Sequence, residues 1–133
     1  MKSEYLISKS ETNSNNQNSK KYDLEERSFK FAKRAIEYVN ELPKTISAIE
    51  IGKQLVRAAG SVGANYIEAN ESLGKKDFIM KIKICRKESK EARYWLRLST
   101  PSEFYKKEKD LLIKEAAELM NIFGAILKKI TNG

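Results

Sequence analysis

Residues 75–98 read KKDFIMKIKICRKESKEARYWLRL, and this stretch decides the fold because it carries two different helical stripes. At about 3.6 residues per turn, side chains three and four positions apart share one face of a helix. The first stripe is narrow and mostly apolar, so it predicts packing against other helices. It consists of Phe78, Ile82, Cys85, Ser89, Ala92 and Leu96.

The second stripe, called the basic stripe below, lies on the adjoining face of the same predicted helix. Residues 75–98 hold nine basic and three acidic residues, a net charge of +6, in a chain whose 133 residues carry +8 in total. Charge concentrated in this way attracts polyanions. A solvated surface, or a charged lining inside an oligomer, needs the same residues, so these interpretations stay open. The basic stripe consists of Lys76, Lys83, Arg86, Lys90, Arg93 and Arg97.

The composition favours one all-α domain. A chain of 133 residues with two prolines and six glycines is large enough to bury a core and is helical in profile. Its one cysteine, Cys85, excludes an intramolecular disulfide and fits a reducing compartment. No apolar run approaches the ~18 residues of a membrane span, and residues 1–11 lack the apolar segment of a signal peptide. We expect a cytoplasmic protein without membrane contact.

The chain divides into a predicted tail and one predicted domain. Residues 1–21 hold too few apolar side chains to offset the entropy of ordering, so they predict a disordered polar tail. Residues 22–133 form the expected four-helix bundle domain. Its first helix is predicted to begin at Asp23, which forms a capping box with Glu26, and to end before Pro43.

Three further helices complete the predicted fold. Ser47 and Glu50 have capping-box spacing and open the second helix, while residues 100–103, with Pro101 in the first turn, open the fourth. Short connections make successive helices antiparallel, so we predict an up-down-up-down four-helix bundle. The first and fourth helices carry apolar faces wider than such a bundle requires. We therefore expect part of this surface to be buried between subunits.

The middle of the second predicted helix is unusually rich in small residues. Residues 58–65 read AAGSVGAN, and Gly60 and Gly63 each cost about 1 kcal/mol relative to alanine in a helix interior. This pattern predicts close approach by another helix. A phosphate-binding loop does not fit, because no strand precedes the segment and neither GxxxxGK[ST] nor GxGxxG is present.

The residue pattern does not favour catalysis. The chain contains no histidine, which removes the Ser-His-Asp and Cys-His arrangements and the Glu-x-x-His ligands of di-iron bundles. Cys85 lies on the apolar stripe, where a small buried thiol needs no reactivity. Glu68, Glu88 and Glu91 are candidates for a carboxylate metal site. Ion pairs with Lys87, Lys90 or Arg93, or with arginines of neighbouring helices, explain them better. We expect no enzyme, no catalytic residue, no cofactor and no metal site.

Two aromatic residues, Tyr94 and Trp95, lie near the end of the basic stretch. Aromatic rings beside arginine stack on unpaired nucleic-acid bases in many proteins. Such residues also serve as anchors in a core or an interface. The sequence leaves both interpretations open.

Beyond their periodicity, the residues resemble a bacterial protein family over about residues 22–130. The motifs that carry the resemblance are Ser61-Val62-Gly63-Ala64-Asn65-Tyr66 with Glu68-Ala69, Lys76-Asp77-Phe78-Ile79, and Lys87-Glu88 with Glu91, Tyr94, Trp95 and Leu96. Through them the chain is similar to the four-helix-bundle protein family, also called the 23S ribosomal RNA intervening sequence protein family.

The resemblance implies a four-helix bundle that assembles into a ring-shaped homo-oligomer, with the pentamer as the form associated with relatives. The chain also looks like the accessory proteins of diversity-generating retroelements, which are associated with nucleic acid and a reverse transcriptase. The biochemical role of the family is poorly defined, and it supplies no catalytic residue. One departure is Gly74, which stands where a serine cap is expected and weakens that cap by a few tenths of a kcal/mol.

Two hypotheses follow for the function. The first is a non-enzymatic, homo-oligomeric bundle that binds RNA or another nucleic acid through the basic stripe. Phosphate contacts would then give affinity with little sequence specificity. The alternative is a structural or adaptor ring that binds a protein partner, such as a reverse transcriptase, through the same stripe.

Overall fold

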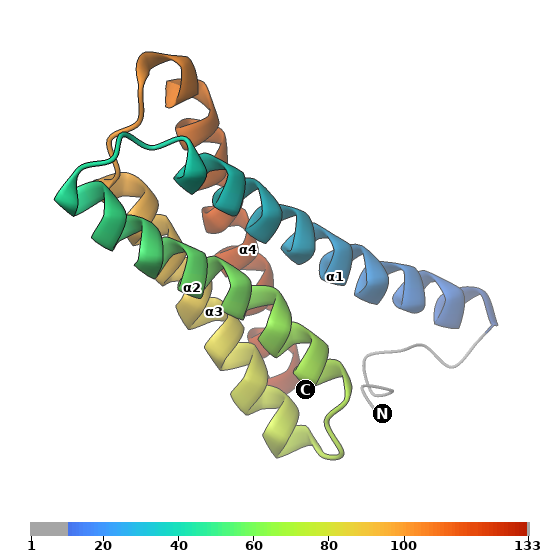
Figure 1. Ribbon diagram of the computed structural model, residues 1–133. Helices are drawn as coiled ribbons and strands as arrows, with labels where there is room; N and C mark the ends of the chain where they lie inside the picture. The colour runs from blue at the N-terminus through green and yellow to red at the C-terminus, as the bar shows by residue number, and fades with distance from the viewer. Residues whose placement is uncertain (1–10, 133) are drawn as a thin grey trace.

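A computed structural model describes the backbone of residues 11–132 and the side chains of residues 23–132. Its helices are α1 (Glu11–Asn40), α2 (Ile46–Asn70), α3 (Lys75–Leu98) and α4 (Lys106–Asn132), with a 3-10 turn, η2 (Glu103–Tyr105), before α4. Residues 11–132 contain no strand, so the all-α class is confirmed. Figure 1 shows the helices gathered into one bundle, with the N-terminal end of α1 projecting beyond the others. No helix of the described part is long and apolar enough to cross a membrane.

The start of α1 differs from the prediction. The helix begins at Glu11, so Asp23 and Glu26 lie inside it and do not form the predicted capping box. Once a helix is nucleated, each added residue gains a hydrogen bond for a small entropic cost, so a polar segment can extend a packed helix. Of the predicted tail, residues 1–10 lie outside the described residues, and residues 11–21 lie in α1.

The predicted starts of α2 and α4 are also wrong by a few residues. Thr45 caps α2, since its Oγ1 accepts a hydrogen bond from the N–H of Ala48 at 3.1 Å, and Ser47 lies inside the helix. Ser102 is the cap residue of η2 and makes no side-chain hydrogen bond there, so Pro101 lies before the helix. Several residues with capping chemistry lie within one turn, and spacing alone does not choose among them.

The core lies along the inner faces of the four helices. Every residue of the apolar stripe of α3 is buried, as predicted. The wide apolar face predicted for the first helix is only partly buried: Phe29 and Ile36 are 60% and 41% exposed. The residues of this face that are buried are Leu24, Phe31, Ala35, Tyr38 and Leu42. The largest fully buried side chains are Tyr38, Phe31, Phe78, Phe123, Leu55, Ile82, Leu96, Leu112, Leu119, Val62 and Cys85.

Helices α1 and α2 approach closely at two glycines. A Cβ atom added at Gly63 would lie 3.3 Å from Ser28 Cβ, and one added at Gly52 would lie 2.8 Å from Val39 Cγ1. The predicted close approach is therefore confirmed at Gly63. It is wrong within the described chain for Gly60, which is exposed and where an added Cβ would meet nothing within 4 Å.

Charged side chains join α1 to α4. Arg27 Nε donates to Glu115 at 2.7 Å, and Arg27 Nη2 donates to Glu118 at 2.6 Å. Further along the two helices, Arg34 donates to both oxygens of Glu108 at 3.0 Å. The hydrogen bond to Glu115 is the main reason that the pKa of Arg27 is raised. Glu108, Glu115 and Glu118 are thereby engaged within the chain.

Candidate nucleic-acid interface

The basic stripe runs along α3 from Lys76 to Arg97, which is about 32 Å of helix axis at 1.5 Å per residue. Five of its six residues are exposed, and Arg93 is half-buried. Among the described side chains, none of the six has an acidic partner within the 4.0 Å of an ion pair. The predicted residues thus form a row of positive charge without an ion-pair partner among the described side chains.

The two glutamates in the middle of α3 lie on the side that packs against α2. Arg57 Nη1 donates to Glu88 Oε1 at 3.2 Å and to Glu88 Oε2 at 3.3 Å, and Arg57 Nη2 donates to Glu91 at 2.6 Å. These bonds, chiefly the one to Glu88, raise the pKa of Arg57. The predicted pairing of both carboxylates with an arginine of a neighbouring helix is confirmed.

The third carboxylate considered for a metal site, Glu68, is engaged elsewhere. Lys81 Nζ donates to Glu68 Oε1 at 2.7 Å, and this hydrogen bond raises the pKa of Lys81. Glu68 therefore has its own cation, separate from the one that binds Glu88 and Glu91. Within the described residues, no group of three or more cysteine or acidic side chains is placed to hold a metal ion.

One arginine of the stripe lies against α4. A Cβ atom added at Gly124 would lie 3.4 Å from Arg86 Nε and 3.7 Å from Arg86 Cζ, so the missing side chain leaves room for the guanidinium. No pattern in the sequence singled out Gly124. Its signal is a glycine in a helix interior, where it costs about 1 kcal/mol relative to alanine.

Arg93 lies closer to the protein interior than the other residues of the stripe. Its Nε atom is buried and has no hydrogen-bond partner among the described residues. A buried guanidinium N–H without an acceptor is unfavourable, so Arg93 is the one residue of the stripe with an unsatisfied buried donor among the described side chains.

The two aromatic residues of the basic stretch differ in environment. Trp95 is half-buried and packs against the core, which makes it an anchor. Tyr94 is 53% exposed. Their ring centroids are 5.0 Å apart with an angle of 77° between the planes, an edge-to-face contact. The structure therefore shows that Trp95 is a core anchor and that Tyr94 is a surface residue, a difference that the sequence does not reveal.

A comparison with protein families identifies the chain. The model described as 23S rRNA-intervening sequence protein matches residues 20–125. The chain belongs to the 23S rRNA-intervening sequence protein family. This confirms the resemblance seen in the sequence.

This member of the 23S rRNA-intervening sequence protein family is also similar to a solved structure. That structure is a protein with unknown function from the S23 ribosomal protein family of Bacteroides thetaiotaomicron VPI-5482. The two are 27% identical, with a TM-score of 0.70, and the match covers 82% of this chain and 98% of the other. A search of curated proteins finds no match.

The single cysteine of this family member is buried, as predicted. Cys85 Sγ donates to the carbonyl oxygen of Val62 at 3.4 Å. Burial raises the pKa of the thiol to about 12, so the reactive thiolate is scarce at neutral pH. These observations fit a core residue.

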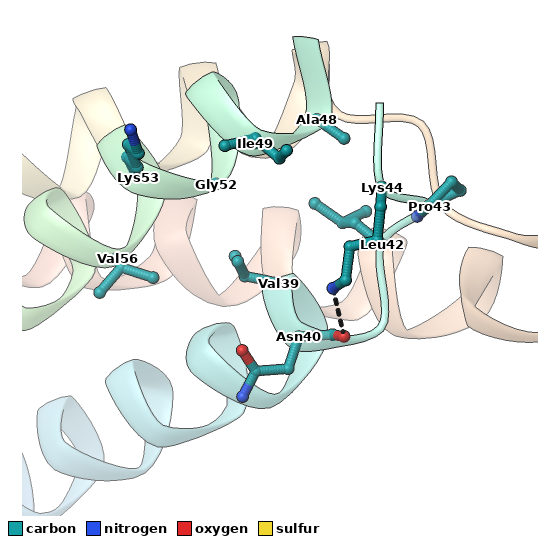
Figure 2. A pocket seen from close by; sticks show the side chains of 10 residues that line it. All are labelled: Val39, Asn40, Leu42, Pro43, Lys44, Ala48, Ile49, Gly52, Lys53 and Val56. Carbon is teal, nitrogen blue, oxygen red and sulfur yellow. Dashed lines mark hydrogen bonds between the residues drawn. The ribbon is translucent and has the colours of Figure 1, made fainter. Parts of the chain in front are cut away.

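Helices α1 and α2 carry four exposed apolar side chains, called the apolar strip below. At the α1–α2 turn, one of them, Ile49, lines a depression of about 420 Å³ together with Val39 and Val56 (Figure 2). At its rim, Lys44 Nζ donates to the carbonyl oxygen of Asn40 at 3.1 Å. The apolar strip consists of Phe29, Ile36, Ile49 and Ile67, which are 60%, 41%, 46% and 52% exposed.

Proposed function

We propose that this member of the 23S rRNA-intervening sequence protein family is a non-enzymatic protein that binds RNA or another nucleic acid through the basic stripe of α3. The observation that carries the proposal is that six cations along about 32 Å of helix have no acidic partner among the described side chains. Phosphate groups would supply the missing negative charge. Such contacts give affinity and position without reading sequence.

The distribution of the acidic residues supports this proposal. Glu88 and Glu91 of α3 are bound by Arg57 of α2, and the glutamates of α4 that pair do so with α1. A polyanion that approaches the stripe therefore meets few competing carboxylates. Lys76, Lys83, Lys90 and Arg97 recur every seven residues, which places a cation about every 10.5 Å along one line.

We infer that the helices form an antiparallel, up-down-up-down bundle. The order of the contacts supports this arrangement. Along α1, Arg27 meets Glu115 and Glu118, whereas the later Arg34 meets the earlier Glu108. The contacts between α2 and α3 follow the same order.

We further propose that copies of the chain assemble into a ring-shaped homo-oligomer in the cytoplasm, with the pentamer as the form that the family resemblance implies. The apolar strip and Gly60 support assembly. Gly60 lies on α2 between Ile49 and Ile67, and no contact within the described chain explains its cost of about 1 kcal/mol in a helix. Close approach by a second copy of the chain at Gly60 would explain this cost. Native mass spectrometry of the wild type and of Ile36→Glu tests this, since the substitution should reduce the mass to that of smaller species.

A structural or adaptor ring that binds a protein, such as a reverse transcriptase, is the second candidate. The apolar strip favours it, because exposed apolar surface of this kind marks protein contacts. In that case the basic stripe would dock an acidic protein surface. The two candidates differ in how binding to nucleic acid responds to changes in the stripe.

The test is binding of a fluorescent structured RNA over a series of salt concentrations. The variant Lys83→Glu/Arg86→Glu/Lys90→Glu reverses the middle of the stripe. The control Lys30→Glu/Lys33→Glu/Lys114→Glu makes the same change in net charge at exposed residues of α1 and α4. Circular dichroism and native mass establish that all three proteins are folded and equally assembled.

We expect the stripe variant to lose affinity and to show a shallower dependence on salt, while the control stays close to wild type. Each lost phosphate contact should reduce the salt slope by about 0.7 to 0.9. If both variants bind like the wild type, or lose affinity equally, the RNA interface is not the basic stripe. A protein partner then becomes the leading candidate.

A further inference from the structure

We propose that Tyr94 stacks on an unpaired base, and that the C-terminal end of α3 therefore prefers single-stranded nucleic acid to duplex. This inference rests on the proposed function. To the proposed function it adds the class of nucleic acid that is bound, and a contact residue that is not one of the six cations of the basic stripe. In a duplex the bases stack on one another, whereas an unpaired base offers a free face to an aromatic ring.

Tyr94 lies on α3 between two cations of the basic stripe. Lys90 lies four residues before Tyr94 and Arg97 lies three residues after it, so all three share one face of the helix. Both cations are exposed and have no ion-pair partner among the described side chains. Phosphates on either side of a stacked base would thus find a cation. This alternation of aromatic ring and cation is the usual architecture of single-strand binding grooves.

The ring of Tyr94 is held in place by its neighbour along the chain. Trp95 holds the ring in an edge-to-face contact, with centroids 5.0 Å apart, and is itself fixed against the core. The ring of Tyr94 is braced from within the chain while 53% of the residue remains exposed. A ring already held in place loses little freedom when a base binds.

The charge around Tyr94 on α3 is positive. Glu91 is the one acidic residue between Lys90 and Leu98, and Arg57 binds its carboxylate at 2.6 Å. The surroundings of Tyr94 are therefore positive. A purely structural tyrosine would not need this charge.

The experiment compares wild type, Tyr94→Ala and Tyr94→Phe for binding to a fluorescent 12-nucleotide oligouridylate and to an RNA duplex of about the same length. Phe104→Ala is the matched control. Phe104 is 86% exposed and contacts Tyr105 edge-to-face at 5.2 Å, but it lies in η2 beside a depression lined by Arg34 and Glu37 of α1. The emission of Trp95, the single tryptophan, gives an independent signal next to Tyr94.

We expect Tyr94→Ala to weaken oligouridylate binding by about 5- to 150-fold, the range for loss of one base–aromatic stack. Duplex binding should stay unchanged, Tyr94→Phe and Phe104→Ala should resemble wild type, and oligouridylate should change the emission of Trp95 in wild type. Unchanged oligouridylate binding, or an equal loss for both nucleic acids, would overturn the inference. So would a change in native mass, which would make Tyr94 a contact between copies.

The same measurements on Lys83→Glu/Arg86→Glu/Lys90→Glu separate the two proposals. If this variant loses affinity while Tyr94→Ala does not, the basic stripe binds nucleic acid without stacking. If this variant binds both nucleic acids like wild type, the proposed function itself fails.

Discussion

Arg57 of α2 bonds both carboxylate oxygens of Glu88 on α3, at 3.2 and 3.3 Å. The side chain of Glu88 is only 8% exposed, whereas that of Arg57 is 48% exposed. The pair therefore consists of a nearly buried anion and a cation at the surface. Loss of the cation leaves a buried charge unpaired, while loss of the anion leaves an arginine that still reaches water and Glu91.

The two members of this pair should differ in their effect on stability. We expect Arg57→Ala to lower the free energy of unfolding by about 1–3 kcal/mol, the penalty for a buried group that loses its partner. Glu88→Leu should cost less, because it removes the buried charge itself. Urea unfolding followed by circular dichroism measures both values. If Glu88→Leu instead lowers the free energy of unfolding more than Arg57→Ala does, the carboxylate of Glu88 stabilises the fold by more than the penalty for leaving it unpaired.

Larger side chains at two glycines should change stability in opposite directions, because Gly52 lies in the contact between α1 and α2 whereas Gly74 lies in open space. At Gly52 an added methyl group would lie 2.8 Å from Val39 Cγ1, so overpacking, typically about 1–3 kcal/mol, should exceed the ~1 kcal/mol gained in helix propensity, and Gly52→Ala should destabilise the bundle by up to about 2 kcal/mol. At Gly74 nothing lies within 4 Å and the residue is the N-cap of α3 without a side-chain bond. Gly74→Ser should stabilise by a few tenths of a kcal/mol. Thermal unfolding of both variants checks the two signs.

Burial of Cys85 predicts a loss of stability at high pH. The ordinary thiol pKa is about 8.5, and burial raises that of Cys85 to about 12. Between these values the unfolded chain releases a proton that the folded chain retains, so the free energy of unfolding falls as pH rises. Tyr66, whose pKa burial raises to about 12, contributes in the same direction above pH 10.

The measurement is urea unfolding at intervals between pH 7 and pH 11. The wild type should be constant below about pH 8.5 and then decline. Cys85→Ala should decline less steeply, even though the smaller side chain lowers its stability at every pH. Equal slopes in the two proteins would contradict a buried, protonated thiol.

The contact of Arg86 with Gly124 gives a functional prediction. Gly124→Leu should displace the guanidinium from α4, and we expect weaker RNA binding with a salt slope reduced by about one contact, 0.7 to 0.9. Gly124→Ala is the control, because its methyl group would lie 3.4 Å from Arg86 Nε and leaves the guanidinium in place. Fluorescence anisotropy across a salt series compares the two. Equal binding by both variants would mean that Arg86 contributes no phosphate contact.

The sequence predicts α3 well because both of its stripes are local patterns. Each residue of the apolar stripe is buried, and five residues of the basic stripe are exposed. Helical periodicity alone places these residues on their faces. Family membership could also be seen in the sequence, since its motifs lie within residues 20–125.

Other features depend on how one helix lies against another, which local patterns do not contain. Phe29 and Ile36 lie on the wide apolar face predicted for α1, yet their side chains stay largely exposed, at 60% and 41%. The choice of Arg57 as partner of Glu88 and Glu91 follows from the register of α2 against α3. The room at Gly124 likewise follows from the packing of α4 against Arg86.

The pairing of Glu88 and Glu91 with Arg57 has a consequence for how the molecule meets its surroundings. Residues 75–98 carry a net charge of +6 in any state of the chain, but in an unfolded molecule their nine cations and three anions follow one another along one flexible segment. Folding binds Glu88 and Glu91 to Arg57 on the side of α3 that faces α2 and leaves the basic stripe on another side. The folded protein thereby acquires a directional electric field, which would turn the molecule toward a polyanion before contact. Charge segregation of this kind exists only while α2 and α3 stay in register.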